Sequence, residues 1–230
     1  MKTLIAIVLS LIALDLIVFV LVAVREIKSI KERDPAARNN LEVLLLYSGL
    51  HAIVRHRIAH FFYRHHLFFL ARAISQHNRF LTGIEIHPGA KIGRGLFIDH
   101  GTGVVIGETT VIGDNCTIYQ GVTLGGTGKD KGKRHPTLEH DVMVGAGAKV
   151  LGPVVIGAGS KVAAGAVVLT DVPENSTCVG VPARIVRING KRPHFCDDLD
   201  QIHIPDPVSQ ELCKIYKRLD DLEQAHFRKE

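Results

Sequence analysis

The sequence predicts a mainly β protein whose central part is a triangular parallel β-helix, and three observations support this prediction. Aliphatic residues recur every six positions, and Gly often follows one of them, as in Ile92-Gly93 and Val144-Gly145. A short strand followed by a tight turn occupies six residues, and three such units close one triangular coil. Strands of an ordinary β-sandwich do not keep a six-residue period for so long. The aliphatic positions, interrupted twice, are Ile86, Ile92, Ile98, Ile106, Ile112, Ile118, Leu124, Leu138, Val144, Val150, Ile156, Val162 and Val168.

The segments on either side of this pattern have other compositions. Residues 1–25 are almost entirely apolar, and residues 26–82 carry apolar side chains at mixed three- and four-residue spacing, which is typical of helices. Residues 189–230 begin as a linker with prolines and continue as a charged segment that predicts a helix at about 207–228. We therefore expect a hydrophobic helix, a small α-helical subdomain, the β-helix over 83–188, and a C-terminal tail with a helix.

The first segment predicts a membrane-spanning helix, because residues 4–24 are about as long as a bilayer requires. Asp15 is its only charge, and sixteen of its residues are Leu, Ile, Val or Phe, which outweigh the cost of one carboxylate. Lys2 precedes it, whereas Arg25, Lys28, Lys31 and Arg33 follow it. The positive-inside rule then places the rest of the chain on the cytoplasmic side of the membrane. The alternative is a cytoplasmic protein in which this helix is buried in an oligomer.

Composition excludes several other classes of protein. The formal charge is +5 and the pI is about 9.1, but the charges are dispersed and there is no Trp, so we expect no nucleic-acid partner. An anionic small molecule fits this charge better. The four cysteines have no paired CxxC spacing, which favours reduced thiols over disulfides or a zinc site; they are Cys116, Cys178, Cys196 and Cys213.

Histidines are frequent in the predicted helical subdomain, and His56 and His60 stand four residues apart, as a pair of metal ligands can. No Glu occupies the middle of an HExxH pattern. The sequence therefore favours a basic, partly exposed helix face over a metal site.

The six-residue pattern is broken twice, and both breaks have the composition of functional loops. Ile106 follows Ile98 by eight positions instead of six, and the interval carries Asp99-His100-Gly101-Thr102-Gly103. Between Leu124 and Leu138 the excursion at 125–136 is rich in Gly and then in basic residues: Lys129, Lys131, Lys133, Arg134 and His135.

Several segments, in order, resemble the successive motifs of bacterial serine acetyltransferases over residues 34–187. The resemblance implies that the β-helix is left-handed, which the period alone does not determine, and that residues 83–188 form the catalytic domain. The segments are Asp34-Pro35-Ala36, Gly83-Ile84-Glu85-Ile86-His87-Pro88, Ile98-Asp99-His100-Gly101-Thr102-Gly103, Gly121-Val122-Thr123-Leu124-Gly125-Gly126-Thr127-Gly128-Lys129, Arg134-His135-Pro136 and Gly180-Val181-Pro182-Ala183-Arg184.

Transfer of an acetyl group from acetyl-CoA to the hydroxyl of L-serine needs a general base, because that hydroxyl is barely ionised near neutral pH. His100 is the expected base. The resemblance implies that Glu85 accepts a hydrogen bond from the other ring nitrogen, although the long members of the family have Asp there. The motifs contain no nucleophilic Cys or Ser, which favours direct transfer in a ternary complex.

The resemblance also implies how the two substrates are bound. Asp34 and Asp99 would face the ammonium group of serine, and Arg134 and His135 would hold its carboxylate. Structural alternatives are an N-cap role for Asp34 and a turn role for His135 before Pro136. Acetyl-CoA acts as co-substrate, with no tightly bound cofactor and no metal; its expected contacts are Thr127, Ala146, Lys161 and Ala164.

Family members of this kind form trimers or dimers of trimers with active sites between neighbouring β-helices, and they catalyse the first step of cysteine biosynthesis. Long forms dock onto O-acetylserine sulfhydrylase through a C-terminal isoleucine, whereas this sequence ends in Glu230, which puts that partnership in doubt. Three rival functions stay open: acetylation of another acceptor such as a sugar amine, a metal hydratase using His100, His135 and His140, and a non-catalytic scaffold.

Overall fold

The computed structural model describes residues 23, 26–128, 132–191, 215–216 and 218–219. The chain divides into two units, Met1–Lys191 and Arg192–Glu230. Four residues of the second unit are described, and all four are helical. Among the described residues, no helix is both long and apolar enough to cross a membrane. The predicted span at 4–24 lies, apart from Ala23, outside the described residues.

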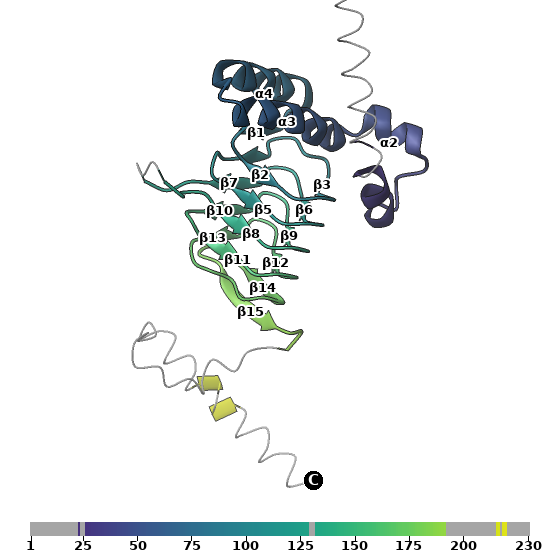
Figure 1. The fold of residues 1–230 in the computed structure, drawn as a ribbon. Helices are drawn as coiled ribbons and strands as arrows, with labels where there is room; N and C mark the ends of the chain where they lie inside the picture. Colours follow the sequence, from purple (N-terminus) through teal and green to yellow (C-terminus); the bar gives the residue numbers. More distant parts are fainter. Residues whose placement is uncertain (1–22, 24–25, 129–131, 192–214, 217, 220–230) are drawn as a thin grey trace, which may run out of the picture. The chain divides into compact units, whose positions relative to one another are not determined.

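The first unit is built on a parallel β-helix of three sheets (Figure 1), which confirms the predicted mainly β fold class. Sheet A consists of β1 (Glu85–Ile86), β4 (Val105–Ile106), β7 (Thr123–Gly125), β10 (Lys149–Leu151) and β13 (Val167–Val168). Sheet B consists of β2 (Lys91–Ile92), β5 (Val111–Ile112), β8 (Thr137–Leu138) and β11 (Val155–Ile156). Sheet C consists of β3 (Phe97–Ile98), β6 (Thr117–Ile118), β9 (Met143–Val144), β12 (Lys161–Val162), β14 (Ser176–Val179) and β15 (Arg184–Ile188).

The predicted period places one aliphatic side chain of each strand inside the coil. Ile86, Ile106 and Leu124 are in register along sheet A and are almost completely buried. Burying a Val, Leu or Ile side chain contributes roughly 1.5–3 kcal/mol, so a dozen stacked positions dominate the stability of the coil. Of the predicted positions, only Ile92 in the first coil is not fully buried. At the far end of sheet C, β15 pairs antiparallel with β14.

The loops between the sheets stack into three columns, which we name by the sheets they join. The A–B corner consists of the loops that leave sheet A for sheet B, and the B–C and C–A corners are defined in the same way. In the C–A corner, Gly121 donates its N–H to the carbonyl of Thr102, and Gly147 donates to that of Gln120. Residues in successive coils of one corner are therefore neighbours, whereas different corners lie on different edges of the coil.

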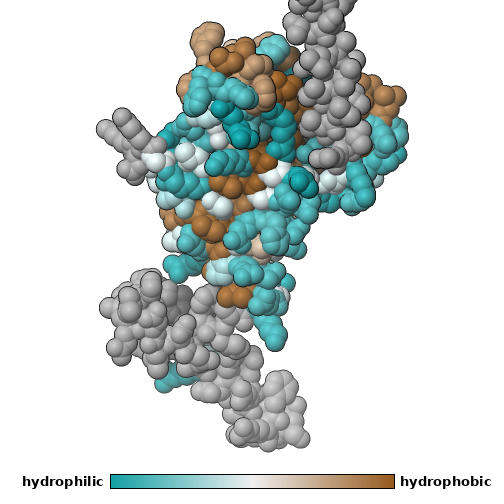
Figure 2. All heavy atoms as spheres, in the orientation of Figure 1, coloured by the Kyte–Doolittle hydropathy of each residue, from teal (hydrophilic) through white to brown (hydrophobic). Residues whose placement is uncertain are grey.

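The helical subdomain covers the first coil. It consists of α2 (Asn40–Leu46), α3 (Ser48–Arg64) and α4 (Phe68–Thr82), and α2 is capped by the Asn39 side chain, which accepts the N–H of Glu42. α3 and α4 pack against each other and contact β3 and β1, respectively (Figure 1). The backbone of α3 lies so close to β3 that a Cβ on Gly49 would be 2.2 Å from the carbonyl oxygen of Ile98. Apolar side chains gather on the outer surface at this end of the unit (Figure 2), where Phe69 and Phe80 are exposed.

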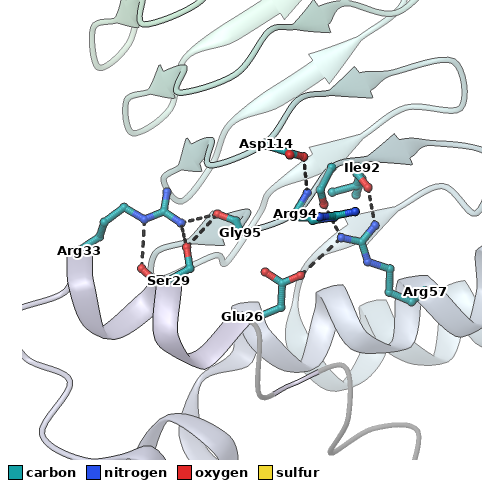
Figure 3. Close-up of polar contacts among 9 residues, drawn as sticks. Glu26, Ser29, Arg33, Arg57, Ile92, Arg94, Gly95 and Asp114 are labelled. Atoms are coloured by element: carbon teal, nitrogen blue, oxygen red, sulfur yellow. Dashed lines mark hydrogen bonds and ion pairs between the residues drawn. The ribbon is translucent and has the colours of Figure 1, made fainter.

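Two arginines fix the helical segment 26–33 to the first coils (Figure 3). Arg33 donates to the carbonyl of Gly95 and to Ser29, and Arg57 donates to the carbonyls of Ile92 and Gly93. Glu26 is buried and lies 3.5 Å from Arg57. Because Arg33 is the last helical residue, these contacts also fix the start of the following segment, which begins with Asp34.

Candidate active site

His100 lies in the C–A corner, in the loop that follows β3 and forms the first of the two predicted breaks in the repeat. Its backbone is left-handed, with a φ of 58°, a conformation that is uncommon for a residue other than Gly. The ring is exposed, and its Nε2 is 3.9 Å from Oδ1 of Asp99. Ser48 at the start of α3 donates to the His100 carbonyl at 3.4 Å. The loop thus presents the imidazole outward from the coil, where a substrate can reach it.

Two of the predicted serine-binding carboxylates belong to this same corner. Tyr47 donates its hydroxyl to Oδ2 of Asp34 at 2.6 Å, and the pKa of Tyr47 is raised to about 12 by burial and by this hydrogen bond. The charge of Asp99 raises the pKa of Tyr47 as well, so Asp99 lies near the tyrosine. The structure therefore brings Asp34, Asp99 and His100 to one corner. Tyr47 was not predicted, because its position between two helices gives no signal in the sequence.

The structural alternative for Asp34 was an N-cap, and the structure differs from it. The side chain that caps α2 is Asn39, whereas Oδ1 of Asp34 accepts the N–H of Ala36 in a turn. The Asp34 carboxylate is therefore held by a local turn and by Tyr47, and it lies in the segment that precedes α2.

Glu85, at the start of β1, makes its ion pairs with α4. Its carboxylate oxygens are 3.4 Å from Arg72 and 3.2 Å from Arg79. Among the described residues, the structure gives no contact between Glu85 and His100. The role of Glu85 as orienting partner of the base stays a prediction.

Arg134 is held at the A–B corner by a residue that the sequence reasoning missed. Its guanidinium lies 2.5 Å from Oε2 of Glu108, and Tyr63 of α3 donates to the other oxygen of Glu108 at 3.0 Å. Burial alone would raise the pKa of Glu108, but the hydrogen bonds from Tyr63 and Arg134 hold it below the usual value. Its place in the sequence, two positions after the repeat residue Ile106, does not distinguish it from other loop residues.

His135 is buried beside Arg134, and its ring is bound by Thr109. The main-chain N–H of Thr109 donates to Nδ1 at 3.2 Å, and the Thr109 hydroxyl lies 2.9 Å from the same atom. A Cβ on Gly107 would be 1.9 Å from Cδ2 of the ring, so only Gly fits there. Burial, and then the charge of Arg134, lower the pKa of His135. The side chain is thus more than a turn residue before Pro136.

The predicted acetyl-CoA contacts lie in the same two corners and on sheet C. Ala146 and Ala164 lie in the C–A corner below His100, joined by the N–H of Gly165, which donates to the carbonyl of Ala146. Lys161 is exposed on β12. Thr127 lies in the A–B corner, where its Oγ1 would be 3.3 Å from a Cβ on Gly152. No single corner of one chain holds all the predicted substrate contacts.

The three histidines of the rival metal hydratase lie at three different corners. His100 belongs to the C–A corner, His135 to the A–B corner and His140 to the B–C corner, where its Nδ1 is 2.8 Å from Asp141. Within the described part of the chain, no three His, Cys, Asp or Glu residues are arranged to hold a metal ion. The structure therefore does not assemble that site in one chain.

Of the α3 histidines, His56 differs from the partly exposed face that was expected, whereas His51 and His60 are half-buried. His56 is buried, and its pKa is lowered to about 3 by burial and then by Arg57. Nδ1 of His60 lies 2.7 Å from the carbonyl of Pro88. His56 is therefore a neutral side chain that packs at the top of the coil, because α3 lies against it.

Known proteins are similar to this sequence over most of its length. A family profile described as bacterial transferase hexapeptide (six repeats) matches residues 135–170, and one for the hexapeptide repeat of succinyl-transferase matches residues 103–126. The serine acetyltransferase of Bacillus licheniformis is 59% identical over 199 residues, which cover 86% of this chain and 91% of the relative. The serine acetyltransferase of Bacillus subtilis is 56% identical over 89% of this chain and 94% of the relative.

This chain belongs to the serine acetyltransferase family. Among solved structures, soybean serine acetyltransferase complexed with serine is 48% identical with a TM-score of 0.70, over 72% of this chain and 68% of that one. A serine acetyltransferase in complex with CoA is 43% identical with a TM-score of 0.69, over 73% and 69%. These likenesses agree with the left-handed turn of the β-helix that the resemblance implied.

The Glu108–Arg134 pair predicts a pH dependence of stability. Since the folded pKa of Glu108 lies below the usual 4.5, its charge stabilises the fold above the unfolded pKa, and this contribution is lost as the pH falls through the folded pKa. We expect Glu108→Gln to lower the melting temperature at neutral pH, and this deficit to shrink as the pH falls below 4.5 and through the folded pKa. Glu32→Gln is the control, because its pair with Lys28 is exposed and contributes little. An equal deficit at every pH would contradict the prediction.

Proposed function

We propose that this chain is a serine O-acetyltransferase that transfers the acetyl group of acetyl-CoA to L-serine, giving O-acetyl-L-serine and CoA, with His100 as the general base. The observation that carries the proposal is the exposed imidazole of His100 beside the carboxylates of Asp99 and Asp34, in a chain of this family. An acceptor with a hydroxyl and an ammonium group fits such a corner.

The reaction proceeds as one addition and one elimination. His100 removes the proton from the serine hydroxyl as its oxygen attacks the thioester carbonyl, forming a C–O bond. The tetrahedral intermediate then collapses with breakage of the C–S bond, and the imidazolium returns its proton to the departing CoA sulfur. One proton leaves the serine oxygen and one reaches the thiolate, so the base is regenerated without an acyl-enzyme.

Charge determines how serine lies in the site. Asp34 and Asp99 bind the ammonium group, and Arg134 and His135 bind the carboxylate. Tyr47 fixes Asp34, and Glu108 fixes Arg134, so both ends of the substrate meet side chains held by hydrogen bonds. The acetyl-CoA contacts lie along the β-helix, where Ala146 and Ala164 allow a close approach and Lys161 meets an anionic group. Glu85 orients or stabilises the His100 imidazolium once the site is assembled.

The positions of these residues support an active site between two copies of the chain. His100 and the two aspartates lie at the C–A corner, whereas Arg134 and His135 lie at the A–B corner, on a different edge of the same coil. One serine molecule is too small to span two corners of one chain. A ring of copies in which the C–A corner of one faces the A–B corner of the next completes every site, and a homotrimer closes such a ring.

The function is tested by thiol release from acetyl-CoA with different acceptors. We expect release that depends on L-serine, with O-acetylserine formed in equal amount, and negligible release with glucosamine or other sugar amines. The expected carboxylate partners explain this preference, since a sugar amine has no carboxylate to accept hydrogen bonds from Arg134 and His135. Faster release with a sugar amine than with L-serine would assign the chain to the alternative acceptor class.

A membrane location is part of the proposal and rests on the sequence of residues 4–24 alone. We propose that this segment anchors the enzyme with its catalytic part on the cytoplasmic side. The full-length chain should then sediment with membranes and resist extraction at alkaline pH. Recovery in the supernatant would favour the cytoplasmic alternative.

A further inference from the structure

Thr109 is bonded to Arg134 and His135 through both its main chain and its side chain. Its hydroxyl oxygen accepts the main-chain N–H groups of Arg134 and His135, each at 3.0 Å. Its own N–H and hydroxyl meet Nδ1 of His135 at 3.2 and 2.9 Å. One threonine thus fixes the backbone that carries the two predicted carboxylate-binding side chains, and also the ring of one of them.

The direction of these bonds determines which nitrogen of His135 carries the proton. A main-chain N–H can only donate, so Nδ1 of His135 is the acceptor of the Thr109 N–H. Burial lowers the pKa of this ring, which favours its neutral form. A neutral imidazole whose Nδ1 accepts has its proton on Nε2. The free edge of the ring is then a hydrogen-bond donor.

Glycines leave room for that edge. A Cβ on Gly107 would be 2.1 Å from Nε2, and one on Gly126 would be 3.2 Å away. A side chain at either position would therefore push the ring aside or cover Nε2. The Nε2–H group lies at the A–B corner, and Arg134 is near enough for its charge to act on the same ring. A carboxylate bound at this corner can then accept from both side chains.

We propose that Thr109 is a positioning residue for serine binding, which holds His135 as the Nε2–H tautomer and aligns it with Arg134 to grip the substrate carboxylate. The inference rests on the proposed function for the identity of the substrate. The tautomer of His135 and its dependence on Thr109 do not rest on the proposed function, because they are properties of the chain without substrate.

The test compares Thr109→Val, which removes the hydroxyl at nearly constant volume, with Thr109→Ser, which keeps it. Thr110→Val is the matched control, since Thr110 is the buried neighbour whose Oγ1 has no hydrogen-bond partner. We expect Thr109→Val to raise the KM for serine about tenfold, with the KM for acetyl-CoA and kcat changed far less. Thr109→Ser and Thr110→Val should keep the wild-type values.

A second readout is independent of activity. In ¹⁵N spectra of the full-length protein with labelled histidine, the His135 ring is assigned by its loss in His135→Gln. We expect an unprotonated Nδ1 and a protonated Nε2 in the wild type and Thr109→Ser, and a shifted or averaged Nδ1 signal in Thr109→Val. A proton on Nδ1 in the wild type would overturn the proposal. So would a Thr109→Val enzyme with an unchanged serine KM, or one in which both KM values rise together.

The two proposals fail in distinguishable ways. If the wild type releases no thiol with L-serine, the proposed function is wrong, while the ring spectra still report whether Thr109 sets the tautomer. If serine is acetylated but Thr109→Val behaves as Thr110→Val does, only the positioning role is wrong.

Discussion

Replacing His100 by Ala lowers kcat for acetyl transfer to serine by about a thousandfold, because a positioned general base contributes roughly 10²–10⁴ to the rate. The serine oxygen then has no group to accept its proton as it attacks the thioester. The KM values should change little, since the ammonium and carboxylate partners of serine remain. Initial rates of thiol release over a range of serine and acetyl-CoA concentrations separate these effects.

The control for His100→Ala is His66→Ala. His66 is also exposed and also has a left-handed backbone, with a φ of 62°, so both substitutions place Ala in the same uncommon conformation. Any loss from backbone strain should therefore be shared, and only His100→Ala should lose activity. If His100→Ala kept more than a tenth of the wild-type kcat, another residue would have to be the base.

Chains with complementary defects should restore each other's activity. One chain carries His100→Ala, and the other carries Arg134→Ala and His135→Ala. Assemblies of the His100→Ala chain alone should be almost inactive. Assemblies of the Arg134→Ala, His135→Ala chain alone should be almost inactive at low serine concentration. In a cyclic trimer containing both kinds of chain, one interface pairs the intact C–A corner of one chain with the intact A–B corner of its neighbour. We expect about one third of the wild-type rate per trimer.

Co-expression with two different affinity tags isolates the mixed assemblies for this measurement. Trimers of a single kind, purified by one tag and mixed afterwards, are the control and should stay inactive as long as subunits do not exchange. Inactive mixed assemblies would mean that each site is built within one chain. A recovery near one half would indicate a two-chain assembly in place of the trimer.

The predicted coil and the predicted site differ in what the sequence could determine. Leu124 and Val150 could be assigned to the interior from spacing alone, because the strand and turn repeat imposes one period on the whole β-helix. Asp34 and Asp99 came from resemblance to a family, and only folding brings them to one corner although they are 65 positions apart in the sequence. Tyr47, which binds Asp34, and Glu108, which binds Arg134, have no signature in spacing.

The burial of His56 is another feature that the sequence alone did not predict. Its helix contains several histidines, and the sequence favoured a basic, partly exposed face. The close packing of α3 against the first coil removes this ring from water and lowers its pKa to about 3. Which face of a helix is buried depends on the element it meets, and that element is distant in the sequence.

The sequence by itself determined the repeating coil, its two interruptions and the residue types available for chemistry, since each follows from local spacing and composition. The tertiary structure alone decided that His100 and Arg134 lie at different corners of the coil. The number of residues in each turn sets the corner at which a loop emerges, and only the closed three-sheet coil converts that number into a position in space.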